Sequence, residues 1–303
     1  MDVLVTGSHG FIASALIPRL RAHGHRVVRL VRRDAAGPDE VRWDPDADEI
    51  DTGGLVGIDA VVHLAGAGIG DKKWTPARKA LILESRTRGT GLLARTLAGL
   101  AHPPPVLISG SAVGYYGNRG DELLTEESAP GADFTAEVCQ AWEAATAPAA
   151  EAGIRVVTVR TGIVLSPDGG VLKRLLLPFK LGLGGRVASG KQYMSWITID
   201  DEVGAIVHLL TADDVHGPVN LTAPNPATNA ELTDALGRAL HRPTVLPTPL
   251  APLKVLYGSE LVQSLLVDGQ RVSSAKLVAS GYAFAHPELD DALAAVLRAP
   301  ASA

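Results

Sequence analysis

The sequence predicts an α/β protein in which helices wrap both faces of a parallel sheet, followed by a smaller, mixed C-terminal lobe. Short apolar runs alternate with helical periodicity five times over residues 1–165, the order of elements in a doubly wound sheet. From Ser166 onward this alternation stops and glycines become frequent. We therefore predict a first domain at 1–165 and a second lobe at 166–303, with some elements of the lobe returning to the first sheet.

The first sixteen residues contain a strand, a tight turn and the start of a helix. Val3–Val5 is an apolar run, Gly7 and Gly10 follow it, and helical spacing begins at Ile12. Gly7 permits the turn, and Gly10 lets the backbone come close to a phosphate. The N–H groups at the helix start and its positive dipole end form an anion site. The segment predicts a site for a dinucleotide pyrophosphate, and an ordinary glycine turn is the alternative.

The second strand, His25–Val31, ends in two arginines, Arg32 and Arg33. In a dinucleotide fold, an acid at this strand end hydrogen-bonds the ribose 2′-hydroxyl of NAD, whereas an arginine accommodates the 2′-phosphate of NADP. No acid precedes Asp34, so this strand end favours NADP(H). A basic pair on a solvated strand end is the alternative.

The next elements complete one side of the predicted site. Residues 35–57 are rich in Asp, Gly and Pro and predict a loop with short strand pieces around 41–43. A buried third strand over 59–66 ends in Ala65 and Gly66, at the sheet edge where the adenosine half of a dinucleotide would be covered. A long helix is predicted over 75–100 from its capping Thr75 and Pro76. We interpret Arg86 and Arg88 in this helix as surface charges when each is taken alone.

Hydroxyl groups gather at the end of the fourth strand, 106–109, and in the loop 110–117. Ser109, Ser111, Tyr115 and Tyr116 could orient or protonate a carbonyl oxygen, because a hydroxyl both donates and accepts hydrogen bonds. No base is visible beside them, so a structural glycine-rich loop is the alternative. A helix over 132–153 and a fifth strand over 154–165 end the first domain.

Composition restricts the classes of function. The chain has 303 residues and a formal charge of −5, and its Lys and Arg residues are scattered, which excludes a basic surface for nucleic acid and favours a small-molecule substrate. The single cysteine, Cys139, excludes an internal disulfide and a Cys-rich metal site, so no metal is predicted. No apolar run approaches the roughly 20 residues that span a membrane, and no signal-peptide pattern is present. We expect a cytoplasmic monomer or homodimer.

Several segments together resemble, in order, the landmarks of the extended short-chain dehydrogenase/reductases. They are Thr6–Ile12, Asp59–Ala65, Gly89–Leu93, Ser109–Ser111, Tyr116–Gly117 and Ser195–Asp201. Other segments are similar to the atypical branch called epimerase-family proteins, which carry a small extra C-terminal domain. They are Ser111–Gly117, Leu181–Gly185, Ala223–Asn229 and Asp268–Val272. The resemblance covers the whole chain.

The resemblance implies a Rossmann domain that binds NADP(H), with the extra segment at about 250–298. It implies that the pyrophosphate lies against Gly7, Gly10, Phe11 and Ile12. It also implies that Arg32 binds the 2′-phosphate, that Leu64 and Ala65 lie near the adenosine half, and that Arg86 reaches the cofactor. The remaining candidates for cofactor binding are Arg33, Gly66 and Ser109.

The chain departs from the superfamily at its catalytic pair, a tyrosine followed four residues later by a lysine that lowers the pKa of the tyrosine. In the helix where the pair belongs, one register places Phe134 and Val138 at these positions, and the next places Thr135 and Cys139. None of these side chains replaces a lysine-activated tyrosine at neutral pH.

The function predicted from the sequence is an NADP(H)-dependent oxidoreductase acting on an unknown small molecule. Its candidate catalytic groups are Ser111, Tyr115 and Tyr116. A non-catalytic NADP(H)-binding sensor is the alternative, motivated by the missing pair, and a sugar-nucleotide epimerase or dehydratase is a third.

Overall fold

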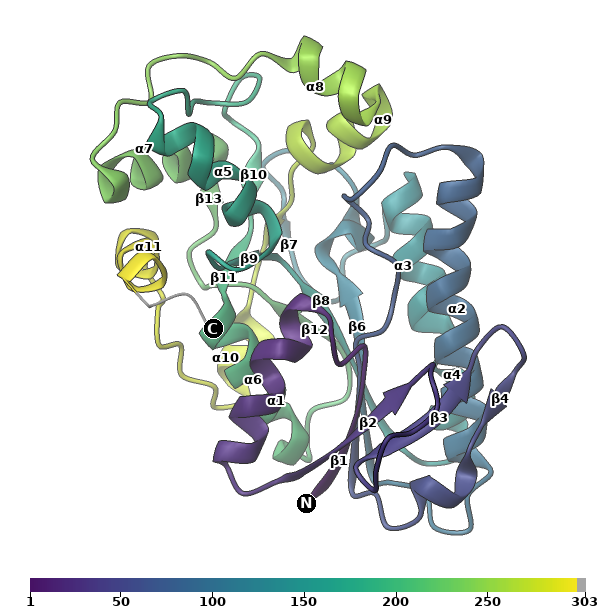
Figure 1. Ribbon diagram of the computed structural model, residues 1–303. Helices are drawn as coiled ribbons and strands as arrows, with labels where there is room; N and C mark the ends of the chain where they lie inside the picture. The colour runs from purple at the N-terminus through teal and green to yellow at the C-terminus, as the bar shows by residue number, and fades with distance from the viewer. Residues whose placement is uncertain (299–303) are drawn as a thin grey trace.

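One eight-stranded sheet runs through the middle of the molecule in the computed structural model, which describes residues 1–298 (Figure 1). The strand order is β12-β8-β6-β5-β1-β2-β3-β4, and all neighbours are parallel except β3 and β4. The strands are β1 (Asp2–Thr6), β2 (Arg26–Val31), β3 (Glu40–Asp44), β4 (Glu49–Ile50), β5 (Ala60–His63), β6 (Val106–Ala112), β8 (Arg155–Thr161) and β12 (Gly217–Leu221). The chain builds outward from β1 to one edge and then returns to β5, so the order reverses between β1 and β5.

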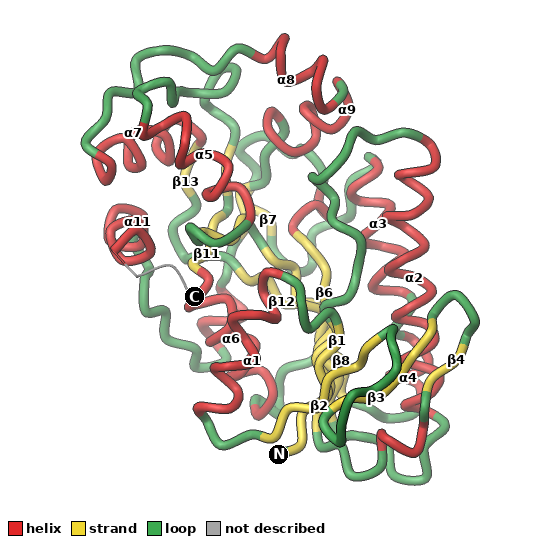
Figure 2. The backbone as a smooth tube through the Cα atoms, viewed as in Figure 1, coloured by secondary structure: helices red, strands yellow, loops and turns green. Residues whose placement is uncertain are grey.

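Helices cover both faces of this sheet, as Figures 1 and 2 show. One face packs on α1 (Phe11–Ala22) and α6 (Ile199–Thr211), and the other on α2 (Pro76–Ala98), α3 (Phe134–Ala144) and α4 (Ala147–Glu151). Side chains alternate across a strand, so Val3 and Val5 enter the first core while Leu4 enters the second. The α/β fold predicted from the sequence is therefore confirmed.

The structure corrects several boundaries in the first 165 residues. The predicted loop 35–57 contains β3, which joins the main sheet, and a short helix, η1 (Thr52–Leu55). The predicted helix 132–153 is divided into α3 and α4, next to Pro148, which has no N–H to donate. The predicted strand 106–109 continues to Ala112, and η2 (Val113–Tyr116) occupies half of the predicted loop 110–117.

The predicted fifth strand, 154–165, bends away from the main sheet at Gly162. A Cβ there would lie 2.3 Å from Ser195 O, so only glycine fits beside this carbonyl. Beyond the bend, β9 (Ile163–Leu165) pairs with β11 (Trp196–Thr198), and β8 alone remains in the main sheet. The edge place beside β8 is taken by β12, which lies in the C-terminal region, residues 166–298.

Apart from α6 and β12, most of the C-terminal region forms a smaller mixed layer beyond the carboxyl edge of the sheet (Figure 2). A third apolar core lies among α5 (Gly170–Lys180), α7 (Asn229–Leu240) and α11 (Leu289–Arg298). A separate apolar cluster joins α2 and α3 to the segment that follows α8. The other elements are β7 (Leu123–Leu124), β10 (Tyr193–Met194), β13 (Ala227–Thr228), α8 (Leu250–Tyr257), α9 (Ser259–Val262), η3 (Gln263–Val267), β14 (Arg271–Val272) and α10 (Ala275–Ala279).

Residues 299–303 of the predicted second lobe lie outside the described residues. Within residues 1–298, no helix combines the length and the apolar character that a membrane crossing requires. The same part of the chain contains no group of three or more His, Cys, Asp or Glu side chains arranged to hold a metal ion.

Candidate functional site

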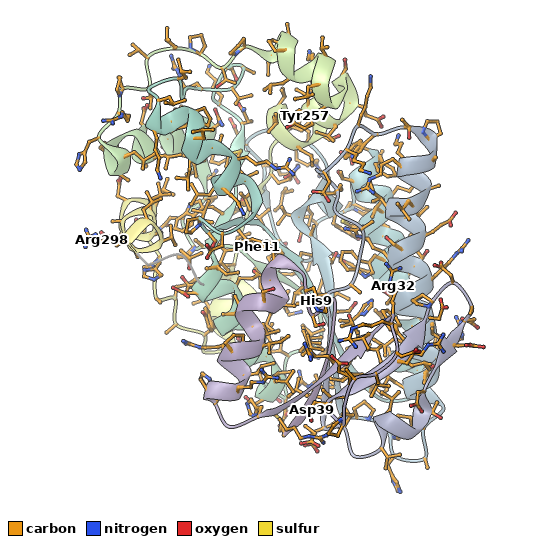
Figure 3. The ribbon with its side chains drawn as sticks, in the orientation of Figure 1. His9, Phe11, Arg32, Asp39, Tyr257 and Arg298 are labelled. Carbon is orange, nitrogen blue, oxygen red and sulfur yellow. The ribbon has the colours of Figure 1, made fainter. Side chains whose placement is uncertain are left out.

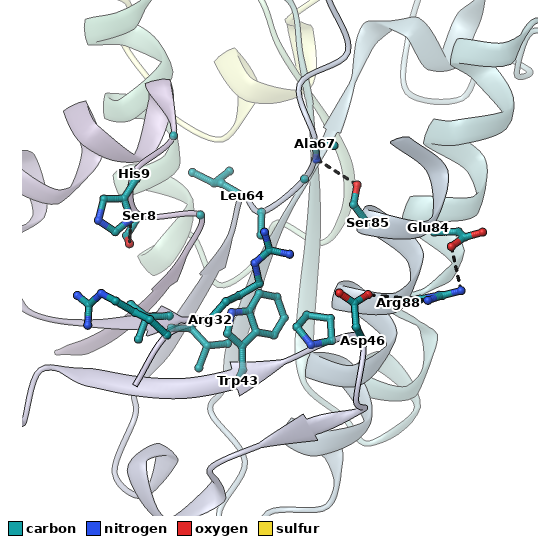
Figure 4. Close-up of a pocket in the computed structure, with 18 of the residues that line it drawn as sticks. Ser8, His9, Arg32, Trp43, Asp46, Leu64, Ala67, Glu84, Ser85 and Arg88 are labelled. Carbon is teal, nitrogen blue, oxygen red and sulfur yellow. Dashed lines mark hydrogen bonds and ion pairs between the residues drawn. The ribbon is translucent and has the colours of Figure 1, made fainter. Parts of the chain in front are cut away.

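A pocket of about 580 Å³ lies at the carboxyl ends of β1, β2 and β5 (Figure 4). Its walls come from the turn after β1, the end of β2, the β3–β4 turn, the loop after β5 and one face of α2. This is where the strand order reverses, the usual place for a ligand in an open parallel sheet. The predicted cofactor residues that line the pocket are Gly7, Gly10, Arg32, Arg33, Leu64, Ala65 and Gly66.

The turn after β1 is shaped by backbone contacts that exclude larger residues. Gly7 has a φ of +64°, and a Cβ there would lie 2.9 Å from the carbonyl carbon and oxygen of Leu64. A Cβ at Gly10 would lie 3.0 Å from Gly7 O. Gly10 begins α1 without a side-chain cap, and the first turn of α1 carries no acid. The first N–H groups of α1 are thus left for an anion.

A chain of buried hydrogen bonds fixes the opposite wall. Thr6 Oγ1 accepts from the N–H groups of Leu64 and Ala65 at 3.1 and 3.2 Å, and it lies 2.8 Å from His63 Nδ1. His63 Nε2 lies 2.9 Å from Thr90 Oγ1 on α2. Burial lowers the pKa of His63 to about 4, so the ring is neutral at pH 7. A neutral imidazole can then relay this hydrogen bonding from β1 to α2.

The arginines in this pocket differ in whether an acid neutralises them. Arg33 donates to both carboxylate oxygens of Glu40, at 2.6 and 2.7 Å. The hydrogen bonds from Arg33 and from Ala36 N hold the pKa of Glu40 at about 2. Arg88 pairs with Glu84 at 2.9 Å and lies 3.8 Å from Asp46. Arg32 forms no hydrogen bond or ion pair within residues 1–298, and its side chain extends into the pocket between Trp43 and Leu64 (Figure 4).

Sequence reasoning missed one side of the pocket. On α2 the pocket-lining residues are Leu81, Glu84, Ser85 and Arg88, at helical spacing on one face. Ser85 Oγ accepts from Ala67 N at 3.0 Å and so holds the loop after β5. The helical spacing of these residues could be seen in the sequence. The positions of Trp43 and Asp46 in the pocket could not be predicted from the sequence, because they depend on the pairing of β3 with the main sheet.

Other predicted cofactor residues lie outside the pocket. Phe11 packs toward the C-terminal region, where a Cβ at Gly169 would lie 2.3 Å from its ring (Figure 3), and Ile12 packs on the first core. Arg86 lies behind the loop after β5, where its Nη1 donates to the carbonyls of Ala67 and Ile82. Ser109 is fully buried, and its Oγ has no partner within residues 1–298.

The predicted catalytic hydroxyls are held in unequal ways. Tyr116 is fully buried; its hydroxyl donates to Asn220 Oδ1 at 2.6 Å and accepts from Arg160 Nη1 at 3.0 Å. Burial raises the pKa of Tyr116 to about 12. Ser111 Oγ donates to Glu143 Oε1 at 2.6 Å, and Arg160 Nε donates to the same oxygen at 2.8 Å. The location of Tyr116 does not fit a proton donor that must reach a substrate, so we correct this prediction to a structural role.

Tyr115 is the remaining candidate and is only half-buried. Its ring lies 3.4 Å from the guanidinium carbon of Arg160, and its hydroxyl has no partner in the described part of the chain. At the positions of the missing catalytic pair, Thr135 Oγ1 donates to Asp133 at 2.6 Å, and burial raises the pKa of the Cys139 thiol to about 11. Neither side chain offers a base at neutral pH.

Comparison with known proteins decides the family. The model of the NAD dependent epimerase/dehydratase family matches residues 3–221, which is most of the chain. The chain belongs to this family. The model of a second family, a domain of unknown function called DUF1731, matches residues 248–296 of the same chain. This stretch contains α8 to α11. The family predicted from the sequence motifs is confirmed, including its extra C-terminal segment.

Relatives within the family are similar over nearly the whole chain. Epimerase family protein Mb2239 of Mycobacterium bovis is 44% identical over 293 residues, 96% of each chain. Human epimerase family protein SDR39U1 is 38% identical over 300 residues, 97% of this chain and 98% of its own. The crystal structure of human SDR39U1 (isoform 2) with NADPH matches with a TM-score of 0.90 at 37% identity, covering 98% and 99% of the two chains.

More distant epimerases share the fold alone. The UDP-glucose 4-epimerase of Thermus thermophilus in complex with NAD matches with a TM-score of 0.74, covering 98% of each chain, at 21% identity. At this identity the likeness is one of architecture and carries no assignment of substrate.

Proposed function

We propose that this protein binds NADP(H) in the pocket at the carboxyl ends of β1, β2 and β5. The observation that carries the proposal is Arg32, a pocket-lining cation without an acid partner at the strand end where a 2′-phosphate would lie. The pocket also fits the pyrophosphate, because Gly7 and Gly10 leave the start of α1 open to an anion. The NADPH bound to human SDR39U1 supports the same choice.

We further propose that the protein reduces a small molecule. Bound NADPH would supply the hydride, while the chain would orient both reactants. Tyr115 is the candidate proton donor, since its hydroxyl has no partner within residues 1–298 and it lies in η2, directly after β6. A tyrosine without a neighbouring lysine donates a proton more readily than it accepts one, so reduction is favoured over alcohol oxidation. A monomer or homodimer in the cytoplasm, with a small-molecule substrate, remains our proposal.

One observation favours a second candidate function, a sensor that binds NADP(H) without catalysis. The hydroxyl of Ser111 donates its hydrogen bond to Glu143, and the hydroxyl of Tyr116 donates its hydrogen bond to Asn220. If Tyr115 has no role in turnover, the other hydroxyl near the end of β6 that is predicted from the sequence and has no partner within residues 1–298 is that of Ser109, which is fully buried. The two functions share the cofactor pocket and differ only in Tyr115.

The cofactor assignment is tested by titrating NADPH and NADH against the wild type and two arginine variants. A charged hydrogen bond to phosphate contributes about 1.5–3 kcal/mol, so the wild type should prefer NADPH by about tenfold or more. Arg32→Ala should remove this preference. Arg26→Ala is the matched control, because Arg26 lies at the other end of β2, paired with Asp2 and Asp39. Equal affinity of the wild type for both cofactors would overturn the assignment.

The chemistry is tested by Tyr115→Phe once screening of NADPH consumption has found a substrate. General acid catalysis contributes about 10²–10⁴-fold, so turnover should fall by that order while NADPH affinity stays unchanged. Tyr116→Phe serves as the control, at a neighbouring ring that is fully buried. Undiminished turnover in Tyr115→Phe would show that Tyr115 is not catalytic. If no substrate is turned over in the screen, the result would favour the non-catalytic sensor.

A further inference from the structure

Three arginines surround the glycine-rich loop Gly66–Asp71, which follows β5. Arg86 and Arg78 reach it from α2; Arg86 Nη1 donates to Ala67 O at 2.9 Å, and Arg78 Nη2 donates to Gly68 O. Arg174 reaches it from α5 in the C-terminal region and donates to Gly70 O at 2.8 Å. Two separate parts of the chain thus bring guanidinium groups to consecutive portions of one loop.

Arg86 is the least compensated of these cations. It forms no ion pair within residues 1–298; its guanidinium lies 4.8 Å from the ring centroid of Trp142, and a Cβ at Gly66 would lie 3.2 Å from its Cζ. Its Nε and Nη2 have no hydrogen-bond partner in the same part of the chain. Burial lowers the pKa of Arg86, and the charge of Arg78 lowers it further. A desolvated cation without a counter-ion is costly, so the site favours an incoming anion.

The loop supplies too few carboxylates to balance the three positive charges. Asp71 lies 3.3 Å from Arg174 and 3.9 Å from Arg78, and its side chain is 58% exposed. In the described part of the chain, no other acid forms an ion pair with any of the three arginines. Arg78 Nε is buried and has no partner there. The hydrogen bonds to loop carbonyls account for only part of the N–H groups, which leaves donors for a ligand.

This cluster adjoins the cofactor pocket. Ala67 lines that pocket and is held there through its N–H by Ser85, while its carbonyl accepts from Arg86. Gly66 also lines the pocket and lies close to Arg86, since a Cβ at Gly66 would be 3.2 Å from Arg86 Cζ. A ligand bound by the arginines would therefore lie next to the cofactor pocket, with the loop backbone at Gly66 and Ala67 between them.

We propose that Arg78, Arg86 and Arg174 bind an oxyanion group, a carboxylate or a phosphate, of the small-molecule substrate. The proposal rests on the proposed NADP(H) function and names the chemical class of its substrate. Guanidinium groups present paired N–H donors in a plane, the geometry that matches carboxylate and phosphate oxygens. Because Arg174 comes from α5 and the other two from α2, an anion bound by all three would join the C-terminal region to the main sheet.

The test is calorimetric titration of inorganic phosphate, and in parallel of acetate, into NADPH-saturated protein at low chloride concentration. Saturation with NADPH keeps the anions out of the cofactor's own phosphate sites. We expect binding of at least one anion, and the tighter of the two identifies the oxyanion class. Arg174→Ala and Arg86→Gln should each weaken this binding about tenfold or more. Asp71→Asn should strengthen it, because it removes the one competing carboxylate.

The controls separate a binding role from a structural one. Arg95→Ala is matched to Arg86, because Arg95 lies on the same helix but pairs with Asp48 at 2.6 Å, and it should leave anion binding unchanged. Arg86→Lys keeps the charge and should restore part of the affinity lost in Arg86→Gln. Arg174 and Asp71 are both more than half exposed, so their variants decide the matter even if Arg86→Gln fails to fold.

The outcomes that overturn the inference are distinct from those that overturn the cofactor assignment. If NADPH binds but neither anion binds, or if Arg174→Ala and Asp71→Asn bind the anions as the wild type does, the anion site is wrong and the NADP(H) function stands. If NADPH does not bind, the proposed function falls. In that case the same variants are made in a protein that also carries Arg32→Ala and are titrated with phosphate in the absence of cofactor. Their affinities still decide whether the three arginines form an anion site.

Discussion

Two groups of polar side chains lie at the carboxyl edge of the same sheet, and they differ in whether their charges are paired. At the end of β8, Arg160 is 3% exposed and is held by Glu143 and Tyr116. At the end of β2, Arg32 faces the pocket with no acid partner within residues 1–298. A paired, buried cation is part of the fold, whereas an unpaired cation lining a pocket is available to a ligand. Residue type alone does not separate the two.

The difference also separates the predicted catalytic residues from the predicted cofactor residues. The Glu143–Arg160 pair occupies the space beneath the loop where the sequence placed three catalytic hydroxyls. Glu143 accepts a hydrogen bond from Ser111, and Arg160 donates one to the hydroxyl of Tyr116. Ser111 and Tyr116 therefore belong to a hydrogen-bonded network with Glu143 and Arg160, and the hydroxyl of Tyr115 lies outside this network.

The largest expected effect comes from breaking the paired group. Although burial alone would lower it, the hydrogen bonds and charge of Glu143 raise the pKa of Arg160. Arg160→Ala leaves Glu143 largely buried without its partner, which should cost about 3–5 kcal/mol in the free energy of unfolding. Arg32→Ala should change this free energy by less than about 0.5 kcal/mol, because no hydrogen bond or ion pair within residues 1–298 is lost. Urea unfolding of both variants measures the contrast, and similar losses in both would contradict it.

A second prediction concerns a buried acid that forms no ion pair with a cation within the described residues. Glu202, in the first turn of α6, is fully buried; its Oε1 accepts from Thr161 at 2.8 Å, and its Oε2 has no partner within residues 1–298. Burial raises the pKa of Glu202 to about 8. The folded protein thus keeps a proton that the unfolded chain releases near pH 4.3, so stability is lost as pH rises from about 4.3 to about 8.

Glu202→Gln should remove this pH dependence. At about 1.4 kcal/mol per pH unit, the wild type should lose on the order of 3–4 kcal/mol of unfolding free energy between pH 5 and pH 8 relative to the variant. The two proteins should have similar stability near pH 5. Denaturant unfolding across this range provides the measurement, and parallel pH profiles would show that Glu202 is ionised or solvated in the folded state.

The parts of the site that the sequence predicts are those fixed by local geometry. Gly7 and Gly10 act through the turn in which they stand, and Arg32 through its place at a strand end, so neighbouring residues suffice to predict them. Trp43 enters the pocket only because β3 pairs with β2, which no local pattern in 35–57 reveals. The hydroxyl of Tyr116 is engaged by Asn220, which is distant in sequence. Pairing between distant residues is the information that the sequence pattern lacks.

The smallest expected effect tests whether a paired cation in the same pocket contributes to binding. Arg88 lines the pocket as Arg32 does, but it pairs with Glu84 at 2.9 Å and lies 3.8 Å from Asp46. Exposed ion pairs contribute about 0–1 kcal/mol, so Arg88→Ala should change the dissociation constant of NADPH by less than about fivefold. Arg32→Ala should cost tenfold or more in the same titration. An Arg88→Ala loss as large as that of Arg32→Ala would mean that Arg88 exchanges its carboxylates for the cofactor phosphate, and that pairing in the free protein does not mark a residue as structural.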